Sequence, residues 1–336
     1  MRARDGPRRL EKDAPHPKNW PRRHKTTKNL WCLVSLLFLI GARGFSPVNA
    51  GSQDPSTVVH AGRLDVLHVE SRALSATRTV RVWLPPGFHS SGRYDVLYLN
   101  DGQNLFGDGD PDSGGGGWHA DEAAARLMRD HNIVSLIIVG IDNAGERSRG
   151  VDYLPVPDPF DSDPGEPGAD RYLRFVIDEL MPFLSKRYPI LSGPAHTGFG
   201  GSSYGAASAL YAALSRPGVF GRLLLESPSV GIGNGVMLER AKTFTEWPER
   251  IVMGVGANEG RGGRGPSGAF QTLVDRLRAA GLGDDRLKVV VQDEARHNEA
   301  AWASRFPDAI AFLFRNTGSA SQNRRRVALS GPPTRG

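Results

Sequence analysis

The residues best suited to chemistry are those at 201–205, whose sequence Gly-Ser-Ser-Tyr-Gly fits the pattern Gly-x-Ser-x-Gly. In this pattern a sharp turn between a strand and a helix exposes the serine hydroxyl, which can then act as a nucleophile in acyl transfer. Glycine fills 41 of the 336 positions, so the pattern carries weight only if its surroundings agree.

The surroundings of this serine predict the strand and the helix that the turn requires. An apolar run at 195–199 precedes it, and an alanine- and leucine-rich stretch at 206–214 follows it. Gly201 and Gly205 flank the turn, where neighbouring strand and helix would leave no room for Cβ atoms. We therefore predict that Ser203 is a nucleophile on a strained turn.

A serine hydroxyl needs a base to take its proton, and the usual base is a histidine oriented by a carboxylate. His297 is the one histidine that follows Ser203 in the sequence. It lies just beyond the last predicted strand and just before the last helix. Because the order serine, acid, histidine is the usual one for such a turn, His297 is the predicted base.

The acid should follow the predicted strand at 251–255, where Glu259 occurs in the sequence Gly-Ala-Asn-Glu-Gly. We favour Glu259 for this role. Four other carboxylates remain open as alternatives, namely Asp293, Glu294, Asp275 and Asp284.

The oxyanion of a tetrahedral intermediate needs preorganised N–H donors. One is expected to be the backbone amide of Tyr204, directly after the nucleophile. The other is expected from the loop Asp-Gly-Gln-Asn at 101–104, where we select the backbone amide of Gln103.

Short β-branched runs alternate with helical patterns along the chain, which predicts an α/β fold with a mostly parallel central sheet and helices on both faces. A helix with a kink at Pro182 is expected from the spacing of Tyr172, Leu173, Val176, Leu180 and Phe183. Three stretches rich in Gly, Pro and Asp, at 107–117, 143–169 and 227–236, are predicted to be irregular pocket walls. Strands are predicted at 80–84, 96–99, 134–141, 195–199, 223–225, 251–255 and 287–291.

Several motifs together resemble the esterase family of α/β-hydrolases that includes enterochelin esterases, esterase D, acetylxylan and feruloyl esterases and mycolyltransferases. They are Asp-Gly-Gln-Asn-Leu-Phe at 101–106, Gly-Ile-Asp-Asn at 140–143, Arg149 with Asp152 and Tyr153, the Gly-x-Ser-x-Gly turn at 201–205 and His-Asn-Glu-Ala-Ala-Trp at 297–302. The resemblance covers residues 57–316 and implies the α/β-hydrolase fold and a serine esterase without metal or cofactor. It also implies Ser203 as nucleophile, His297 as base and Glu259 as acid.

Polar residues near the predicted site are candidates for binding substrate. Asp101 and Asn104 lie on the loop that carries Gln103, and Arg149 and Tyr153 lie in the 143–169 stretch. Arg149 and Tyr153, with Asp152, are expected to pin this loop; gripping a polar substrate is the alternative role.

The N-terminal region is typical of an export signal. A basic stretch precedes an uncharged run at 30–42, which is short for a membrane span and suits the apolar part of a signal peptide. We predict a signal peptide at 1–50, a linker at 51–56, an esterase domain at 57–316 and a disordered tail at 317–336. An uncleaved membrane anchor is the alternative. The single cysteine of the sequence, Cys32, lies inside the apolar run.

Charge argues against a nucleic-acid partner. The first 50 residues carry 11 Lys and Arg and 3 Asp and Glu. This leaves 31 Lys and Arg and 33 Asp and Glu for residues 51–336, a formal charge of −2.

The Gly-x-Gly-x-x-Gly match at 260–265 does not indicate a dinucleotide site, because it does not directly follow a predicted strand as such a site requires.

These observations predict an exported serine esterase that hydrolyses acyl or feruloyl esters of carbohydrate. Hydrolysis of an enterochelin-type siderophore trilactone is the alternative substrate class. Acyl transfer to an alcohol, or ligand binding without turnover, would use the same fold.

Val48 and Ala50 provide small residues at −3 and −1 of a cut before Gly51. N-terminal sequencing of the exported protein should therefore begin at Gly51. Recovery of the 30–42 segment in the exported chain would contradict this prediction.

Overall fold

The computed structural model describes residues 62–109, 116–161, 165–259 and 265–316. These belong to the second of two units, Met1–Asp54 and Pro55–Gly336. The predicted signal peptide, the linker, the tail and most of the 260–265 glycine motif lie outside the described residues. Among the described helices, none has both the length and the apolar character to cross a membrane.

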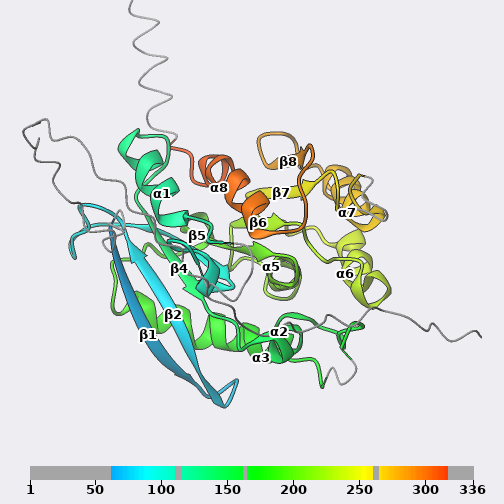
Figure 1. Ribbon diagram of the computed structural model, residues 1–336, viewed down its shortest axis with the longest axis horizontal. Helices are drawn as coiled ribbons and strands as arrows, with labels where there is room; N and C mark the ends of the chain where they lie inside the picture. Colours follow the sequence, from blue (N-terminus) through cyan, green and yellow to red (C-terminus); the bar gives the residue numbers. More distant parts are fainter. Residues whose placement is uncertain (1–61, 110–115, 162–164, 260–264, 317–336) are drawn as a thin grey trace, which may run out of the picture. The chain divides into compact units, whose positions relative to one another are not determined.

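A single eight-stranded sheet with the order β1-β2-β4-β3-β5-β6-β7-β8 forms the centre of the described fold (Figure 1). β2 is antiparallel to both β1 and β4, and every other neighbouring pair is parallel. The predicted mostly parallel sheet is thereby confirmed. The strands are β1 (Arg63–Ser71), β2 (Ala76–Leu84), β3 (Asp95–Asn100), β4 (Leu136–Ile141), β5 (Thr197–Ser202), β6 (Arg222–Glu226), β7 (Arg250–Gly256) and β8 (Leu287–Gln292).

Helices cover both faces of the sheet, as expected (Figure 1). On β3, Leu97 and Leu99 face one apolar cluster with α1 (Ala120–Arg129) and α8 (Glu299–Leu313), while Val96 and Tyr98 face the other cluster. This division follows from the two-residue period of a strand. The second cluster is built with α2 (Glu146–Tyr153), α3 (Ala169–Arg174), η3 (Phe175–Leu180), α4 (Met181–Ser185), α5 (Tyr204–Ser215), α6 (Ile232–Thr243) and α7 (Gly268–Ala279). Two short turns, η1 (Gly102–Asn104) and η4 (Pro194–His196), complete the described elements.

The helix predicted around Pro182 is α3, η3 and α4 in succession, and its middle segment η3 is a π-helix. Proline lacks an N–H and cannot close the normal helical bond, which accounts for irregularity just before it. A π turn adds a residue and rotates the face that follows. Leu184 is therefore buried, whereas Phe183, predicted as a core residue, is 40% exposed.

The predicted strands correspond to β2 through β8, but other expectations need correction. β1 was not predicted, because as an edge strand most of its residues are partly exposed and give no clear apolar run. The 143–169 stretch is not irregular throughout, since it contains α2, and α6 begins inside the 227–236 stretch. β5 also starts later than predicted and continues to Ser202.

β5 and β6 approach each other closely just before the Gly-x-Ser-x-Gly turn. A Cβ atom at Gly200 would lie 2.6 Å from the Cβ of Leu224 and 2.7 Å from its carbonyl oxygen. A backbone atom cannot move aside without disturbing the sheet, so this position accepts only glycine.

We expect Gly200→Ala to lower the free energy of unfolding by about 1–3 kcal/mol, because it overpacks a buried strand. Gly268, the first residue of α7, provides the matched control, since a Cβ atom added there would have nothing within 4 Å. Gly268→Ala should raise the free energy of unfolding by about 0.4–1 kcal/mol. Denaturant unfolding of both variants measures these changes, and equal stabilities would contradict the packing argument.

Candidate active site

Ser203 lies on a tight turn between the end of β5 and the start of α5. Its backbone has φ 57° and ψ −119°, which a residue with a Cβ atom rarely adopts. The Ser203 amide donates to the carbonyl oxygen of Glu226, the last residue of β6, at 2.9 Å. Cβ atoms at Gly201 and Gly205 would both lie about 3 Å from the Cβ of Asn100. The two glycines therefore let β3 approach the turn.

His297 and Glu259 are in direct contact beyond the ends of β8 and β7. His297 Nδ1 lies 2.9 Å from Glu259 Oε2. The Glu259 side chain is 7% exposed and the His297 side chain 45%. Because an ionised carboxylate can only accept, this contact gives Nδ1 the proton and leaves Nε2 free as an acceptor.

The second oxygen of Glu259 is also held. Oε1 accepts from the Gly256 amide at 2.6 Å and from the Ser227 hydroxyl at 2.8 Å. Burial acts to raise the pKa of the Glu259 carboxyl, but the hydrogen bonds from His297, Gly256 and Ser227 outweigh it and lower the pKa below its ordinary value. Glu259 is therefore charged at neutral pH.

Two of the alternative acids contact other partners. Asp275 accepts from Gln271 and Asp284 from Arg278, and both contacts are exposed. In the described ranges, the carboxylate in contact with His297 is Glu259.

The Ser203 hydroxyl lies 3.4 Å from the hydroxyl of Ser229, and within the described residues it has no direct hydrogen bond to His297. Hydrogen bonds between nucleophile and base are often long in free enzymes and shorten when substrate binds.

Two backbone amides start helices at the site. Tyr204 is the first residue of α5, and Gln103 is the second residue of η1, whose first turn is closed by Asn104 N–H donating to Asp101 O at 3.0 Å. The first N–H groups of a helix have no partner inside it and remain available to a ligand. The Gln103 side chain accepts from the Asn143 amide at 3.2 Å, which ties η1 to the end of β4.

Asp101 and Tyr153 are buried parts of a structural cluster. Both oxygens of Asp101 accept from Arg149 at 2.8 Å, and Oδ1 also accepts from Asn143 at 2.7 Å. Tyr153 is fully buried and its hydroxyl accepts from the Asp101 amide at 3.2 Å. This geometry matches the loop-pinning role, although Asp152 pairs with Arg78 and not with this cluster.

Arg149 is partly exposed, whereas Asn104 is buried. The Arg149 guanidinium lies over the rings of Tyr153 and Tyr204 and its side chain is 23% exposed. The Asn104 amide lies 3.4 Å from the Glu299 carboxylate at the start of α8.

Several residues of the site carry no signal that singles them out in the sequence. Ser227 and Ser229 are ordinary serines in a loop, and Trp302 is visible only as the last residue of the motif at 297–302.

Asp158 accepts from the Tyr204 hydroxyl at 2.8 Å and from the Phe160 amide at 2.9 Å. Burial raises the pKa of the Tyr204 hydroxyl far above its ordinary value, so this hydroxyl stays a donor.

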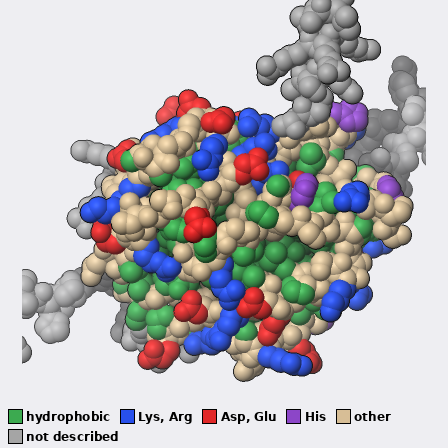
Figure 2. Space-filling view, turned by 180° about the vertical axis from the view of Figure 1, so that it is seen from behind, with side chains coloured by type: hydrophobic (Ala, Val, Ile, Leu, Met, Phe, Trp, Pro, Cys, Tyr) green, Lys and Arg blue, Asp and Glu red, His purple; other side chains and the backbone are tan. Residues whose placement is uncertain are grey.

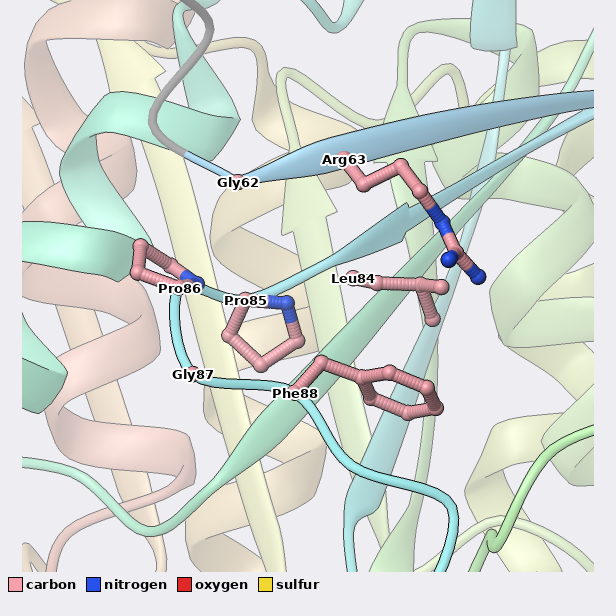
Figure 3. A pocket seen from close by; sticks show the side chains of 7 residues that line it. All are labelled: Gly62, Arg63, Leu84, Pro85, Pro86, Gly87 and Phe88. Carbon is pink, nitrogen blue, oxygen red and sulfur yellow. The ribbon is translucent and has the colours of Figure 1, made fainter.

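A cavity of about 240 Å³ lies elsewhere in the fold, lined by Gly62, Arg63 and residues 84–88 (Figure 3). β2 runs against β4, with Trp83 opposite Ile138, so Leu84 lies toward the amino ends of the parallel strands. Ser203 lies at their carboxyl ends, and the cavity is therefore separate from the site. Figure 2 shows basic and acidic side chains interspersed on one face of the described residues.

We expect Tyr204→Phe to speed chymotrypsin cleavage after Phe160 by about fivefold, because the loop loses one hydrogen bond. Phe160 is 84% exposed, so the protease can reach it. Tyr211→Phe is the matched control, since Tyr211 lies on the same helix and donates to Asp170 at 2.8 Å. Equal cleavage rates in the two variants would show that the Tyr204 contact does not hold this loop.

Comparison with known proteins gives a family match over most of the described chain. The model of the family described as "Putative esterase" matches residues 71–313. The Bacillus subtilis (strain 168) protein YbbA is 22% identical over 250 residues, which cover 71% of this chain and 94% of YbbA.

Solved structures share the fold at low identity. The siderophore hydrolase EstB from Aspergillus nidulans has a TM-score of 0.61 and 18% identity, over 80% of this chain and 98% of EstB. A ferulic acid esterase has a TM-score of 0.57 and 16% identity, over 75% of this chain and 97% of that one. Since the family model spans nearly all described elements, the chain belongs to this esterase family and is a carboxylic ester hydrolase with the α/β-hydrolase fold.

Proposed function

We propose that the chain hydrolyses esters through a catalytic triad of Ser203, His297 and Glu259. The observation that carries this proposal is the 2.9 Å contact between His297 and Glu259, because it leaves Nε2 of His297 as a proton acceptor. Ser203, on its strained turn, supplies the hydroxyl. All three residues follow the carboxyl ends of strands, where α/β sheets bind their ligands.

In the first step, Ser203 Oγ forms a bond to the ester carbonyl carbon while its proton passes to Nε2 of His297. The carbonyl electron pair moves onto oxygen, and the backbone amides of Tyr204 and Gln103 stabilise this oxyanion. The charged Glu259 carboxylate stabilises the imidazolium that forms.

In the second step the intermediate collapses, the bond to the leaving alcohol breaks and the Nε2 proton passes to that alcohol. The acyl group remains on Ser203 as an ester. Water then attacks the acyl carbon while its proton passes to Nε2 of His297. The bond to Ser203 Oγ breaks, Ser203 regains the proton, and the acid is released. An alcohol at this stage would give acyl transfer, which product analysis separates from hydrolysis.

The proposed substrates are acyl or feruloyl esters of carbohydrate, and siderophore esters are the second candidate. His297 is nearly half exposed, so a large alcohol can leave without being enclosed. The similarity of fold to the ferulic acid esterase supports the first class, and the similarity to the siderophore hydrolase EstB supports the second.

We further propose that the chain is exported by its N-terminal segment and cleaved before Gly51. This rests on the basic stretch and the uncharged 30–42 run of the sequence.

The test is a panel of p-nitrophenyl acyl esters, methyl ferulate, acetylated xylan and a catechol trilactone, assayed with Ser203→Ala. We expect Ser203→Ala to lower kcat by at least about 10³-fold, because it removes the nucleophile. Glu259→Ala should retain more activity than Ser203→Ala, because the acid only orients and stabilises the base.

The panel decides both the mechanism and the substrate class. Undiminished turnover by Ser203→Ala would reject the proposed mechanism. Faster turnover of the trilactone than of methyl ferulate or acetylated xylan would favour the siderophore class.

A further inference from the structure

Ser227 and Trp302 form a buried hydrogen-bonded chain that ends on the proposed triad acid. Trp302 Nε1 donates to Ser227 Oγ at 2.8 Å, and Ser227 Oγ donates to Glu259 Oε1 at 2.8 Å. Ser227 and Trp302 are each only 5% exposed. The hydrogen bonds of the proposed triad thus extend from Glu259 to two buried side chains.

The direction of this chain follows from the chemistry of its members. An indole N–H can only donate, so Trp302 occupies a lone pair of the Ser227 oxygen. The Ser227 proton is then directed to the carboxylate, which can only accept. Trp302 thereby makes Ser227 a donor to Glu259, and the two bonds strengthen each other because each polarises the shared hydroxyl.

The carboxylate of Glu259 needs such support. One of its oxygens faces His297, and the other is held by Ser227 and by the Gly256 amide. Without Ser227, a single amide would hold the second oxygen and the carboxylate could rotate away from the imidazole.

The strained backbone of Ser227 indicates that its hydroxyl has a role. Its φ is 46°, a left-handed conformation that glycine adopts more easily. The Ser227 amide donates to the Gly254 carbonyl at 2.7 Å, which fixes the residue between β6 and β7. The two hydrogen bonds of the Ser227 hydroxyl account for the presence of serine at this strained position.

Trp302 also contacts the base itself. Its ring packs edge-on against the ring of His297, with centroids 5.1 Å apart and planes at 85°. One residue of α8 therefore contacts His297 through its ring and acts on Glu259 through its N–H. Phenylalanine would keep an aromatic ring and lose the N–H.

We propose that Ser227 and Trp302 are positioning residues that hold the Glu259 carboxylate against His297 through this chain of two hydrogen bonds. The inference rests on the proposed function, since it assigns their role in the same triad. It extends that function to two residues that do not touch substrate.

The first variant is Ser227→Gly, which removes the hydroxyl and relieves the backbone strain. We expect kcat to fall about tenfold, the effect of one hydrogen bond to a charged group, while KM and the thermal unfolding midpoint stay near those of the wild type. The control is Ser208→Ala, because Ser208 Oγ is buried and without a hydrogen-bond partner in the described residues. This control should keep the wild-type kcat.

The second variant is Trp302→Phe, with Trp247→Phe as control because Trp247 Nε1 is buried and unpartnered among the described residues. Trp302→Phe should lower kcat in the wild-type background and have little further effect in Ser227→Gly, because both act through one hydroxyl. A wild-type kcat in Ser227→Gly, or equal effects of Trp302→Phe in both backgrounds, would overturn the proposal.

A readout without substrate separates this proposal from the proposed function. The Nδ1 proton of His297, bonded to Glu259, should give a low-field NMR signal that shifts or broadens in Ser227→Gly but not in Ser208→Ala. An unchanged signal in Ser227→Gly would overturn the proposed positioning role of Ser227 and Trp302 even if Ser203-dependent turnover is found. A wild type without Ser203-dependent turnover would instead reject the proposed function.

Discussion

Ser203 can keep its strained backbone only because two neighbouring strands, β3 and β6, hold the turn on which it lies. Its conformation, with φ 57° and ψ −119°, costs about 1–3 kcal/mol and persists only where surrounding structure enforces it. Glycines at 201 and 205 let β3 approach, the Ser203 amide bonds to the end of β6, and the Asn100 side chain bonds to the Gly205 carbonyl at 2.8 Å. The same turn starts α5, and so it sets both the direction of the hydroxyl and the position of the Tyr204 amide.

A buried ion pair fixes the other half of the site. Arg305 of α8 bonds to Glu226 of β6 through Nε at 2.8 Å, and the two side chains are 5% and 0% exposed. Burial raises the pKa of Glu226 to about 7 despite the neighbouring Arg305. Glu226 precedes Ser227 in the chain, and Arg305 lies one turn after Trp302. The ion pair therefore holds together the two segments that carry Ser227 and Trp302. Removing one partner would leave a buried charge uncompensated, which is the most damaging change to such a pair.

The sequence predicts the elements with strong local signals and misses those that depend on contacts between distant segments. Seven strands, α5 and the helix after His297 follow from apolar patterns, and Glu259 follows from its place after β7. α2 was not expected, because it depends on Arg149 meeting Asp101, 48 residues earlier. Ser227 could not be selected either, since its role depends on Trp302, 75 residues away. Phe183 was misplaced because a π turn, which apolar spacing does not reveal, rotates the face it occupies.

Labelling the folded protein with a fluorophosphonate, followed by peptide mass spectrometry, tests whether the fold activates one serine hydroxyl. We expect a single phosphonylated site at Ser203, which is lost in Ser203→Ala and forms more slowly in Glu259→Ala. An unlabelled Ser203 in correctly folded protein, or labelling at another residue, would contradict the proposed triad and favour a ligand-binding protein on the esterase fold.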